Sequence, residues 1–124
     1  MKKWITVLFL SVPGFLSIEA QQLQSLYVSM DGDNSNPGTL THPFRTIQHA
    51  LDQAQAGTAI FVMAGTYAET LTASVTGTAA QPVSLKNYSG QNAIIDGAYA
   101  TGAPLLSINN ASYFTVSGLQ FSGY

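Results

Sequence analysis

The sequence predicts an all-β solenoid of stacked coils that one short helix caps at its N-terminal end. Three observations support this prediction. Only one segment after residue 20 spaces its apolar residues as a helix does, the rest alternates short β-rich runs with Gly, Asn and Pro, and apolar positions recur at a nearly constant shift. A chain of 124 residues is long enough for one small domain of this kind.

The segment 1–20 predicts an export signal. Lys2 and Lys3 form a positive start, the apolar run "WITVLFLSVPGFL" follows, and "SIEA" ends on a small residue before Gln21. The run is shorter than the roughly 20 apolar residues that span a bilayer. A buried N-terminal strand is the alternative interpretation. We therefore expect a mature domain over residues 21–124 of a secreted or periplasmic bacterial protein, with no membrane contact once the signal is removed.

Composition excludes several classes of function. The chain has four Lys and Arg residues, a net charge of −2 and no cysteine. Without a basic patch, nucleic-acid binding through phosphate neutralisation is not expected. The absence of cysteine excludes disulfide scaffolds, thiolate zinc sites and a cysteine-linked lipid anchor.

The mature chain begins with an expected strand over residues 26–30 and a loop, "DGDNSNPGT", that is too rich in Asp, Gly, Asn and Pro for regular structure. A helix is expected over residues 44–55, where Pro43 suits the entry and Gly57 the exit. Its apolar face consists of Phe44, Ile47, Ala50, Leu51 and Ala54. Because the end of a solenoid exposes unpaired backbone, we expect this face to cover the first coil. The polar face, which we expect to meet water, carries Gln48, His49, Asp52 and Gln53.

An internal repeat of about 22–23 residues is the expected length of one coil. A shift of 23 aligns three columns, namely Ile60 with Val83 and Leu106, Val62 with Leu85 and Ile108, and Ala64 with Asn87 and Asn110. A shift of 21 aligns Ile95 and Gly97 with Val116 and Gly118. Such columns would stack aliphatic side chains in the interior. The two stacked asparagines predict an amide ladder at a corner, which we prefer to a catalytic role.

The stretch "YVSMDGDNSNPGTLTHPFRTIQHALDQAQAGTAIFVMAGTYAE" resembles the opening of right-handed parallel β-helix proteins of the pectate-lyase-like superfamily, which includes pectate lyases and chondroitinase-B-like enzymes. The marks are Tyr27-Val-Ser, Asn36-Pro-Gly-Thr, Pro43-Phe44 with Thr46-Ile47-Gln48, and Gly65-Thr66-Tyr67 before Glu69. "AIIDG" and "FTVSGLQF" continue the same style, so the resemblance covers residues 26–124. It implies the first rungs of a right-handed parallel β-helix, and we expect the segment to be an incomplete piece of it.

The resemblance implies an exported enzyme that cleaves an acidic polysaccharide by β-elimination. Such a lyase needs a base, commonly Lys or Arg, and carboxylates that bind calcium. In the proteins that the chain resembles, these groups lie on later rungs, so no catalytic residue is assigned here. Ca²⁺ is expected only in the complete protein, and the segment alone should be inactive. A non-catalytic carbohydrate-binding or adhesive module and a glycoside hydrolase stay open as alternatives.

Three residues are weak local candidates for a site. Asp31 and Asp33 imitate the start of a calcium loop, but Asn36 stands where glycine is expected and His42 where glutamate is expected. A solvated turn is the preferred interpretation. Lys86 alternates with buried positions, so it should point outward, where it could touch an acidic sugar or be a plain surface lysine.

The remaining polar residues give no catalytic motif. Glu69 could bond backbone near the first rung, Asp96 precedes a turn glycine, and His42 and His49 lack partners at motif spacing. Several tyrosines could stack on sugars, although aromatic side chains in solenoids more often pack at corners. These are Tyr67, Tyr88, Tyr99, Tyr113 and Tyr124.

Overall fold

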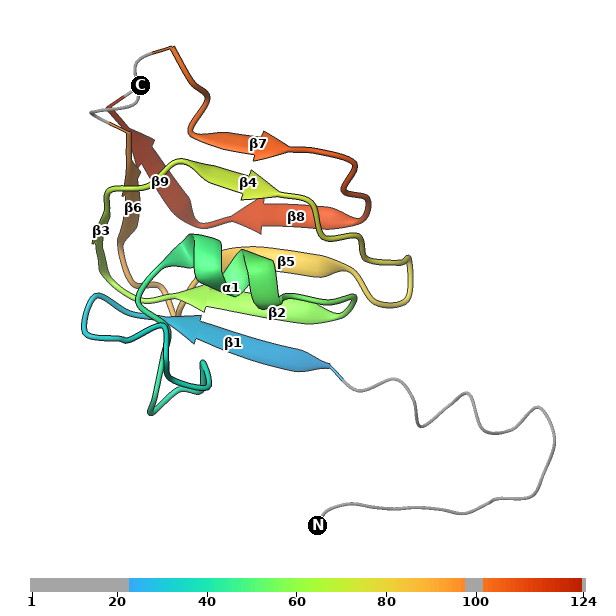
Figure 1. Cartoon of the computed structure of the whole chain (residues 1–124), viewed down its shortest axis with the longest axis horizontal. Coiled ribbons are helices and arrows are strands. Elements are labelled where there is room, and N and C mark those ends of the chain that lie inside the picture. The colour runs from blue at the N-terminus through green and yellow to red at the C-terminus, as the bar shows by residue number, and fades with distance from the viewer. Residues whose placement is uncertain (1–22, 98–101, 124) are drawn as a thin grey trace, which may run out of the picture.

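The computed structural model describes residues 23–97 and 102–123, so the expected signal lies outside the described residues. It contains one helix and nine strands in the described ranges (Figure 1). In chain order these are β1 (Gln24–Val28), α1 (Ile47–Gln53), β2 (Thr58–Val62), β3 (Gly65–Tyr67), β4 (Leu71–Ala73), β5 (Val83–Asn87), β6 (Ala93–Asp96), β7 (Leu106–Ile108), β8 (Phe114–Ser117) and β9 (Leu119–Ser122). No helix of the described residues is long and apolar enough to cross a membrane.

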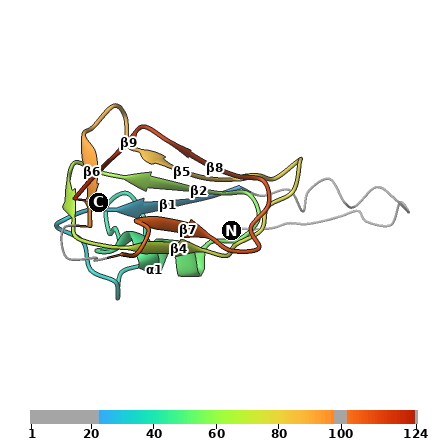
Figure 2. The same ribbon diagram turned by 90° about the horizontal axis from the view of Figure 1, so that it is seen from above.

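The strands form three parallel sheets around a common interior. Sheet A has the order β1-β2-β5-β8, sheet B has β3-β6-β9, and sheet C has β4-β7. The chain passes from sheet A through sheet B to sheet C and then returns to the next strand of sheet A (Figure 2). Every strand pair of the described residues is parallel. The predicted all-β solenoid of parallel coils with one helix is confirmed.

The length of one coil differs from the prediction. In sheet A, Ile60 pairs with Leu85 rather than with Val83, and Leu85 pairs with Val116 rather than with Ile108. In sheet C, Leu71 pairs with Leu106, and this separation along the chain is longer than either of those in sheet A. The expected columns at shifts of 23 and 21 are therefore wrong.

Unequal connections explain the error. The segment from sheet C to sheet A covers residues 74–82 after the first coil but only 109–113 after the second. The segment from sheet B to sheet C covers 68–70 in the first coil and 97–105 in the second. Because strands alternate apolar residues at every second position, a wrong shift still aligns apolar with apolar.

The amide ladder is also wrong. Asn87 lies opposite Val62 in the register, and its side-chain nitrogen donates to the carbonyl of Gln91 at 2.9 Å. Asn110 follows β7 with a φ of 56°, so it does occupy the left-handed conformation expected at a corner. The neighbour of Asn87 in the next coil is Gly118, where a Cβ atom would clash with the Asn87 amide.

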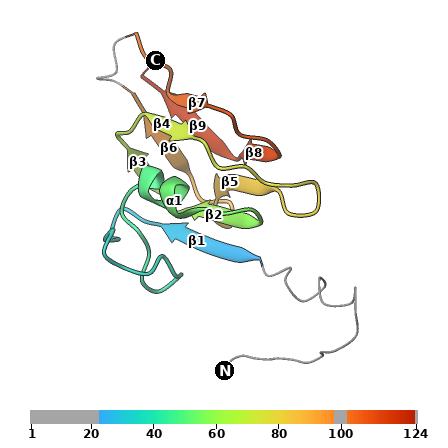
Figure 3. The ribbon, with the colours of Figure 1, turned by 45° about the vertical axis from the view of Figure 1, so that its right-hand side comes forward.

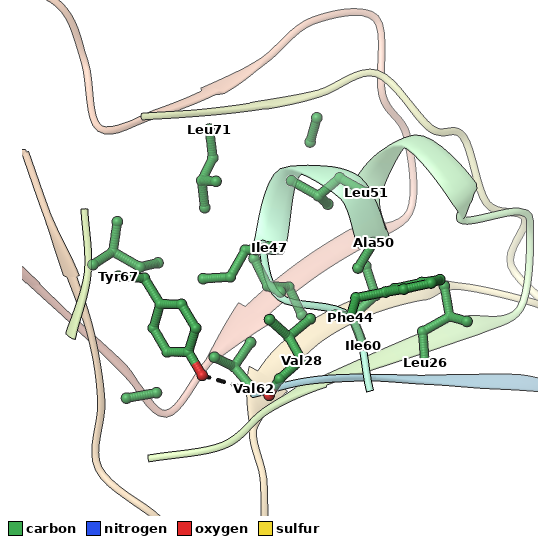
Figure 4. Close-up of a cluster of buried hydrophobic side chains, with 14 residues drawn as sticks. Leu26, Val28, Phe44, Ile47, Ala50, Leu51, Ile60, Val62, Tyr67 and Leu71 are labelled. Carbon is green, nitrogen blue, oxygen red and sulfur yellow. Dashed lines mark hydrogen bonds between the residues drawn. The ribbon is translucent and has the colours of Figure 1, made fainter. Parts of the chain in front are cut away.

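The interior is a continuous stack of apolar side chains (Figure 4). Inward residues of the first levels of sheet A are almost fully buried: Leu26, Val28, Ile60, Val62, Val83 and Leu85. Tyr67 enters the same core, and its hydroxyl donates to the Met63 carbonyl at 2.9 Å. Burial raises the pKa of Tyr67 to about 12.

Helix α1 lies below β4, between β4 and β1 (Figures 1 and 3), and contacts β4, β1 and β2. It is shorter than predicted but buries Ile47, Ala50 and Leu51 as expected. Asp52 and Gln53 are exposed, whereas Gln48 and His49 are half-buried. The predicted capping position is confirmed. The predicted exposure of the polar face is correct for Asp52 and Gln53 but wrong for Gln48 and His49.

Two side chains attach α1 to the coil. The Glu69 carboxylate accepts from the backbone amides of Ile47 at 2.9 Å and Gln48 at 3.0 Å. The Gln48 side chain donates to the Thr72 carbonyl at 3.0 Å and accepts from the Thr72 amide at 2.8 Å. The Gln48 amide thus takes the place of a neighbouring peptide group at the edge of β4, where sheet C would otherwise expose unpaired backbone.

Candidate functional site

The outer face of sheet A carries a row of large side chains. Side chains alternate along a strand, so residues between the buried positions of sheet A point away from the core. The register places Tyr27 beside Phe61, Phe61 beside Lys86, and Lys86 beside Ser117. Tyr27, Phe61 and Lys86 are half-buried. In Figure 2 sheet A lies on the side of the molecule opposite α1 and sheet C, so the helix leaves this face uncovered.

Three aromatic rings meet on this face. The rings of Tyr27 and Phe61 stack with centroids 5.3 Å apart and planes inclined by 20°. Tyr88, the residue after β5, presents its ring edge-on to both, at 5.8 Å from Tyr27 and 6.1 Å from Phe61. These are favourable aromatic geometries. We call Tyr27, Phe61, Lys86 and Tyr88 the Phe61 cluster.

Lys86 gives the Phe61 cluster a positive charge. Its Nζ atom lies 5.2 Å from the centroid of the Phe61 ring, which is a cation–π distance. The four strands of sheet A contain no Asp or Glu. Within residues 23–97 and 102–123, Lys86 forms no ion pair. The net charge of the whole chain is −2, so this face has the opposite sign to the protein as a whole.

Hydrogen bonds fix the turn that holds Tyr88. The Tyr88 amide donates to the Val62 carbonyl at 2.8 Å, and its carbonyl accepts from the Gln91 amide at 2.8 Å. The Asn87 side chain closes the same turn through the Gln91 carbonyl. The Gln91 side chain in turn accepts from the Ala64 amide at 2.8 Å, which links the turn to the coil below. The ring of Tyr88 is therefore attached to a braced segment.

Asp31 and Asp33 lie apart from this face, in the loop after β1. Asp33 accepts from both the amide and the hydroxyl of Ser35, at 2.8 and 2.7 Å, and these bonds lower the pKa of Asp33. The Asp31 amide donates to the Ser29 hydroxyl at 3.1 Å. In the part of the chain that the structure describes, no three His, Cys, Asp or Glu side chains gather at one point. The calcium role of Asp31 and Asp33 stays a prediction.

The other polar residues considered in the sequence make hydrogen bonds or ring contacts within the fold. Glu69 bonds the backbone of α1, as the sequence suggested. His49 packs edge-on against Phe44, with ring centroids 4.5 Å apart, and His42 lies 3.1 Å from the Thr41 hydroxyl. Among the tyrosines, Tyr67 is in the core and Tyr113 is exposed. Tyr99 and Tyr124 lie outside the described residues.

The sequence singled out Lys86 and, among several tyrosines that could stack on sugars, Tyr88, but it did not bring these two residues together with Tyr27 and Phe61. Phe61 was not considered, and Tyr27 was noted only as a mark of the resemblance. The available signal was the position of each aromatic residue between two inward aliphatic ones, "LYV" and "IFV". Tyr27 and Phe61 pair across the loop and the helix that separate β1 from β2, so finding the pair needed the true register, which the assumed repeat did not provide.

Comparison with known proteins decides the family. Residues 26–124 match the family model described as the Pel9A-like, right-handed β-helix region. The chain belongs to the Pel9A-like β-helix family. This membership confirms the resemblance and the right-handed parallel β-helix fold, and it covers almost all of the described residues.

Two curated proteins are similar to this Pel9A-like chain. The uncharacterized protein YwoF of Bacillus subtilis (strain 168) is 40% identical over 98 residues, covering 76% of the chain and 21% of YwoF. Pectate lyase PEL9 of Emericella nidulans is 42% identical over 91 residues, covering 69% of the chain and 22% of PEL9. The Pel9A-like chain thus spans about a fifth of the length of these relatives.

Solved structures of two chemistries share the fold of the Pel9A-like chain. A rhamnogalacturonan lyase matches with a TM-score of 0.67 and 20% identity, over 79% of this chain and 28% of the lyase. The lacto-N-biosidase of Eubacterium ramulus, a family GH136 protein, matches with a TM-score of 0.68 and 20% identity, over 87% of this chain and 22% of the biosidase. At this level of identity the likeness concerns the fold alone, because one fold carries many functions.

Proposed function

We propose that the chain is the N-terminal part of an exported β-helix enzyme that cleaves an acidic polysaccharide by β-elimination. The observation that carries the proposal is the 42% identity to a protein named pectate lyase. The two alternatives are a non-catalytic module and a glycoside hydrolase, and the assay below distinguishes both from a lyase.

β-Elimination requires a base that removes the proton α to a uronate carboxylate and a cation that neutralises this carboxylate. In the complete protein, bound Ca²⁺ would supply the neutralising charge. The described residues offer Lys86 without converging carboxylates, so we assign them to substrate contact and support. The base and the calcium ligands belong, in this proposal, to further rungs of the complete protein.

Export is part of the proposal. It rests on the positive start, the apolar run and the small-residue exit of residues 1–20. Expression with a C-terminal tag in a bacterial host, followed by N-terminal sequencing of the protein outside the cytoplasm, tests it. We expect a new N-terminus close to Gln21. Full retention in the cytoplasm with Met1 intact would reject export.

The reaction is tested by the ultraviolet absorbance of the unsaturated product on pectate, alginate and chondroitin, with and without calcium. The complete protein and this chain are assayed side by side. We expect calcium-dependent absorbance from the complete protein and none from the present chain. New reducing ends without unsaturated product would indicate a hydrolase instead, and binding without cleavage would indicate a non-catalytic module.

A further inference from the structure

We propose that the Phe61 cluster is a binding subsite for one uronate unit of an acidic oligosaccharide. The sugar would contact the solvent-exposed parts of the aromatic side chains, and its carboxylate would pair with Lys86. The inference rests on the proposed function only for the choice of an acidic saccharide. It assigns no catalytic step to this chain.

The aromatic side chains supply the surface for the sugar ring. Large aromatic residues are favoured where an apolar body meets water and a polar ligand. Here three rings gather on one outer face, and Phe61 lies at the centre with Tyr27, Tyr88 and Lys86 around it. All four side chains are half-buried, so each keeps part of its surface open to solvent. Packing accounts for the ring contacts and for the cation–π contact of Lys86 with Phe61, and it leaves Lys86 without a carboxylate partner among the described residues.

The charge of Lys86 selects the class of ligand. In the described part of the chain Lys86 has no carboxylate partner, and sheet A contributes no acidic residue. An ammonium group pairs with a carboxylate through charge-assisted hydrogen bonds. Lys86 and Phe61 are register partners on adjacent strands, so an anion bound to Lys86 lies next to the ring surface. A sugar that carries its own carboxylate satisfies both features at once.

The backbone keeps the subsite in one shape. Tyr27, Phe61 and Lys86 belong to three adjacent hydrogen-bonded strands, and Tyr88 lies on the turn closed by Asn87 and Gln91. Groups held on rigid elements lose little freedom when a ligand binds. We therefore expect binding without rearrangement of the sheet.

The test is calorimetric titration of the whole chain with trigalacturonate and with the neutral trisaccharide of galactose. We expect the acidic sugar to bind roughly tenfold more tightly than the neutral one at low salt. The difference should shrink in about 0.5 M salt, where the Debye length is only a few Å. Equal affinity for the two sugars, or no binding of trigalacturonate at any concentration, would overturn the proposal.

Three variants separate charge, ring and fold. Lys86→Gln should weaken trigalacturonate binding roughly tenfold and leave the neutral sugar unchanged. Arg45→Gln is the matched control, because it removes the same charge from the other Lys or Arg of the described residues and should change neither affinity. Tyr88 lies outside the strands, and Tyr88→Leu should weaken the binding of both sugars several-fold. Equal effects of Lys86→Gln and Arg45→Gln would overturn the charge assignment.

This test and the lyase assay fail independently. Charge-dependent binding by this chain together with no unsaturated product from the complete protein would reject the proposed function and retain the subsite. Unsaturated product from the complete protein together with no Lys86-dependent binding would reject the subsite and retain the function.

Discussion

The first coil and the last strands contain similar apolar residues but bury them to different extents. In β2, β3 and β4 the inward residues Ile60, Val62, Tyr67, Leu71 and Ala73 are almost completely buried. In β7, β8 and β9 the corresponding residues Leu106, Phe114, Val116, Leu119 and Phe121 are only partly buried, and Ile108 is 48% exposed. The first coil has α1 and β1 on one side and a second coil on the other. Burial in this fold therefore depends on neighbours in both directions along the axis, as expected for a repeat structure.

The largest expected effect contrasts two leucines that are register partners. Leu71 of the first coil is 1% exposed, and Leu106 of β7 is half-buried directly beside it. Leu71→Ala should lower the free energy of unfolding by about 3 kcal/mol because it leaves a cavity, and Leu106→Ala by about 1 kcal/mol. Urea denaturation followed by circular dichroism measures both. Equal losses would mean that the two regions do not differ in packing.

A smaller effect concerns Tyr67, whose folded-state pKa is raised to about 12 by burial. Its unfolded pKa is about 10, so the unfolded state releases the proton first. The stabilisation is fully present below pH 10 and is lost as the pH rises toward 12, by an amount on the order of 1–2 kcal/mol. Denaturation midpoints between pH 8 and 12 measure it. Tyr67→Phe should flatten this part of the profile, and an unchanged slope in Tyr67→Phe would refute the assignment.

The smallest effect tests how α1 covers the first coil. Gln48→Ala removes both side-chain bonds to Thr72, together with an exposed bond to Asp52, and should cost about 1 kcal/mol. Gln53→Ala, at an exposed position of the same helix, is the matched control and should change stability by less than about 0.5 kcal/mol. Both variants make the same Gln-to-Ala change on one helix, so chemical denaturation compares a glutamine that contacts β4 with one that is exposed. A cost as large for Gln53→Ala would show that the loss does not come from the Thr72 contact.

The same comparison explains what the sequence could predict. The helix was predictable because Phe44, Ile47, Ala50 and Leu51 repeat within one segment, and its capping position followed from the exposed end of a solenoid. Inward and outward positions of the strands were predictable from alternation. The register was not, because connections of different length separate Ile60 from Leu85 and Leu71 from Leu106.

The Phe61 cluster depends on that register. Lys86 could be placed outward from its own strand, but its partner Phe61 belongs to the coil below, and Tyr27 lies on the strand below that. The calcium candidates Asp31 and Asp33 share a short loop and were easy to find in the sequence. In the structure the Asp33 side chain accepts hydrogen bonds from Ser35 and closes a turn. Local motifs were therefore visible in the sequence, whereas the surface built from distant strands was not.

The most direct test of the account is to locate the saccharide on the molecule. Trigalacturonate is added to the isotopically labelled chain, and amide signals are followed by NMR. We predict shifts concentrated at Tyr27, Phe61, Lys86 and Tyr88, with none at Leu71 and Leu106 on the opposite side. Shifts centred on sheet C or α1, or signals that do not move at saturating sugar, would contradict the claim that the outer face of sheet A contacts the polysaccharide.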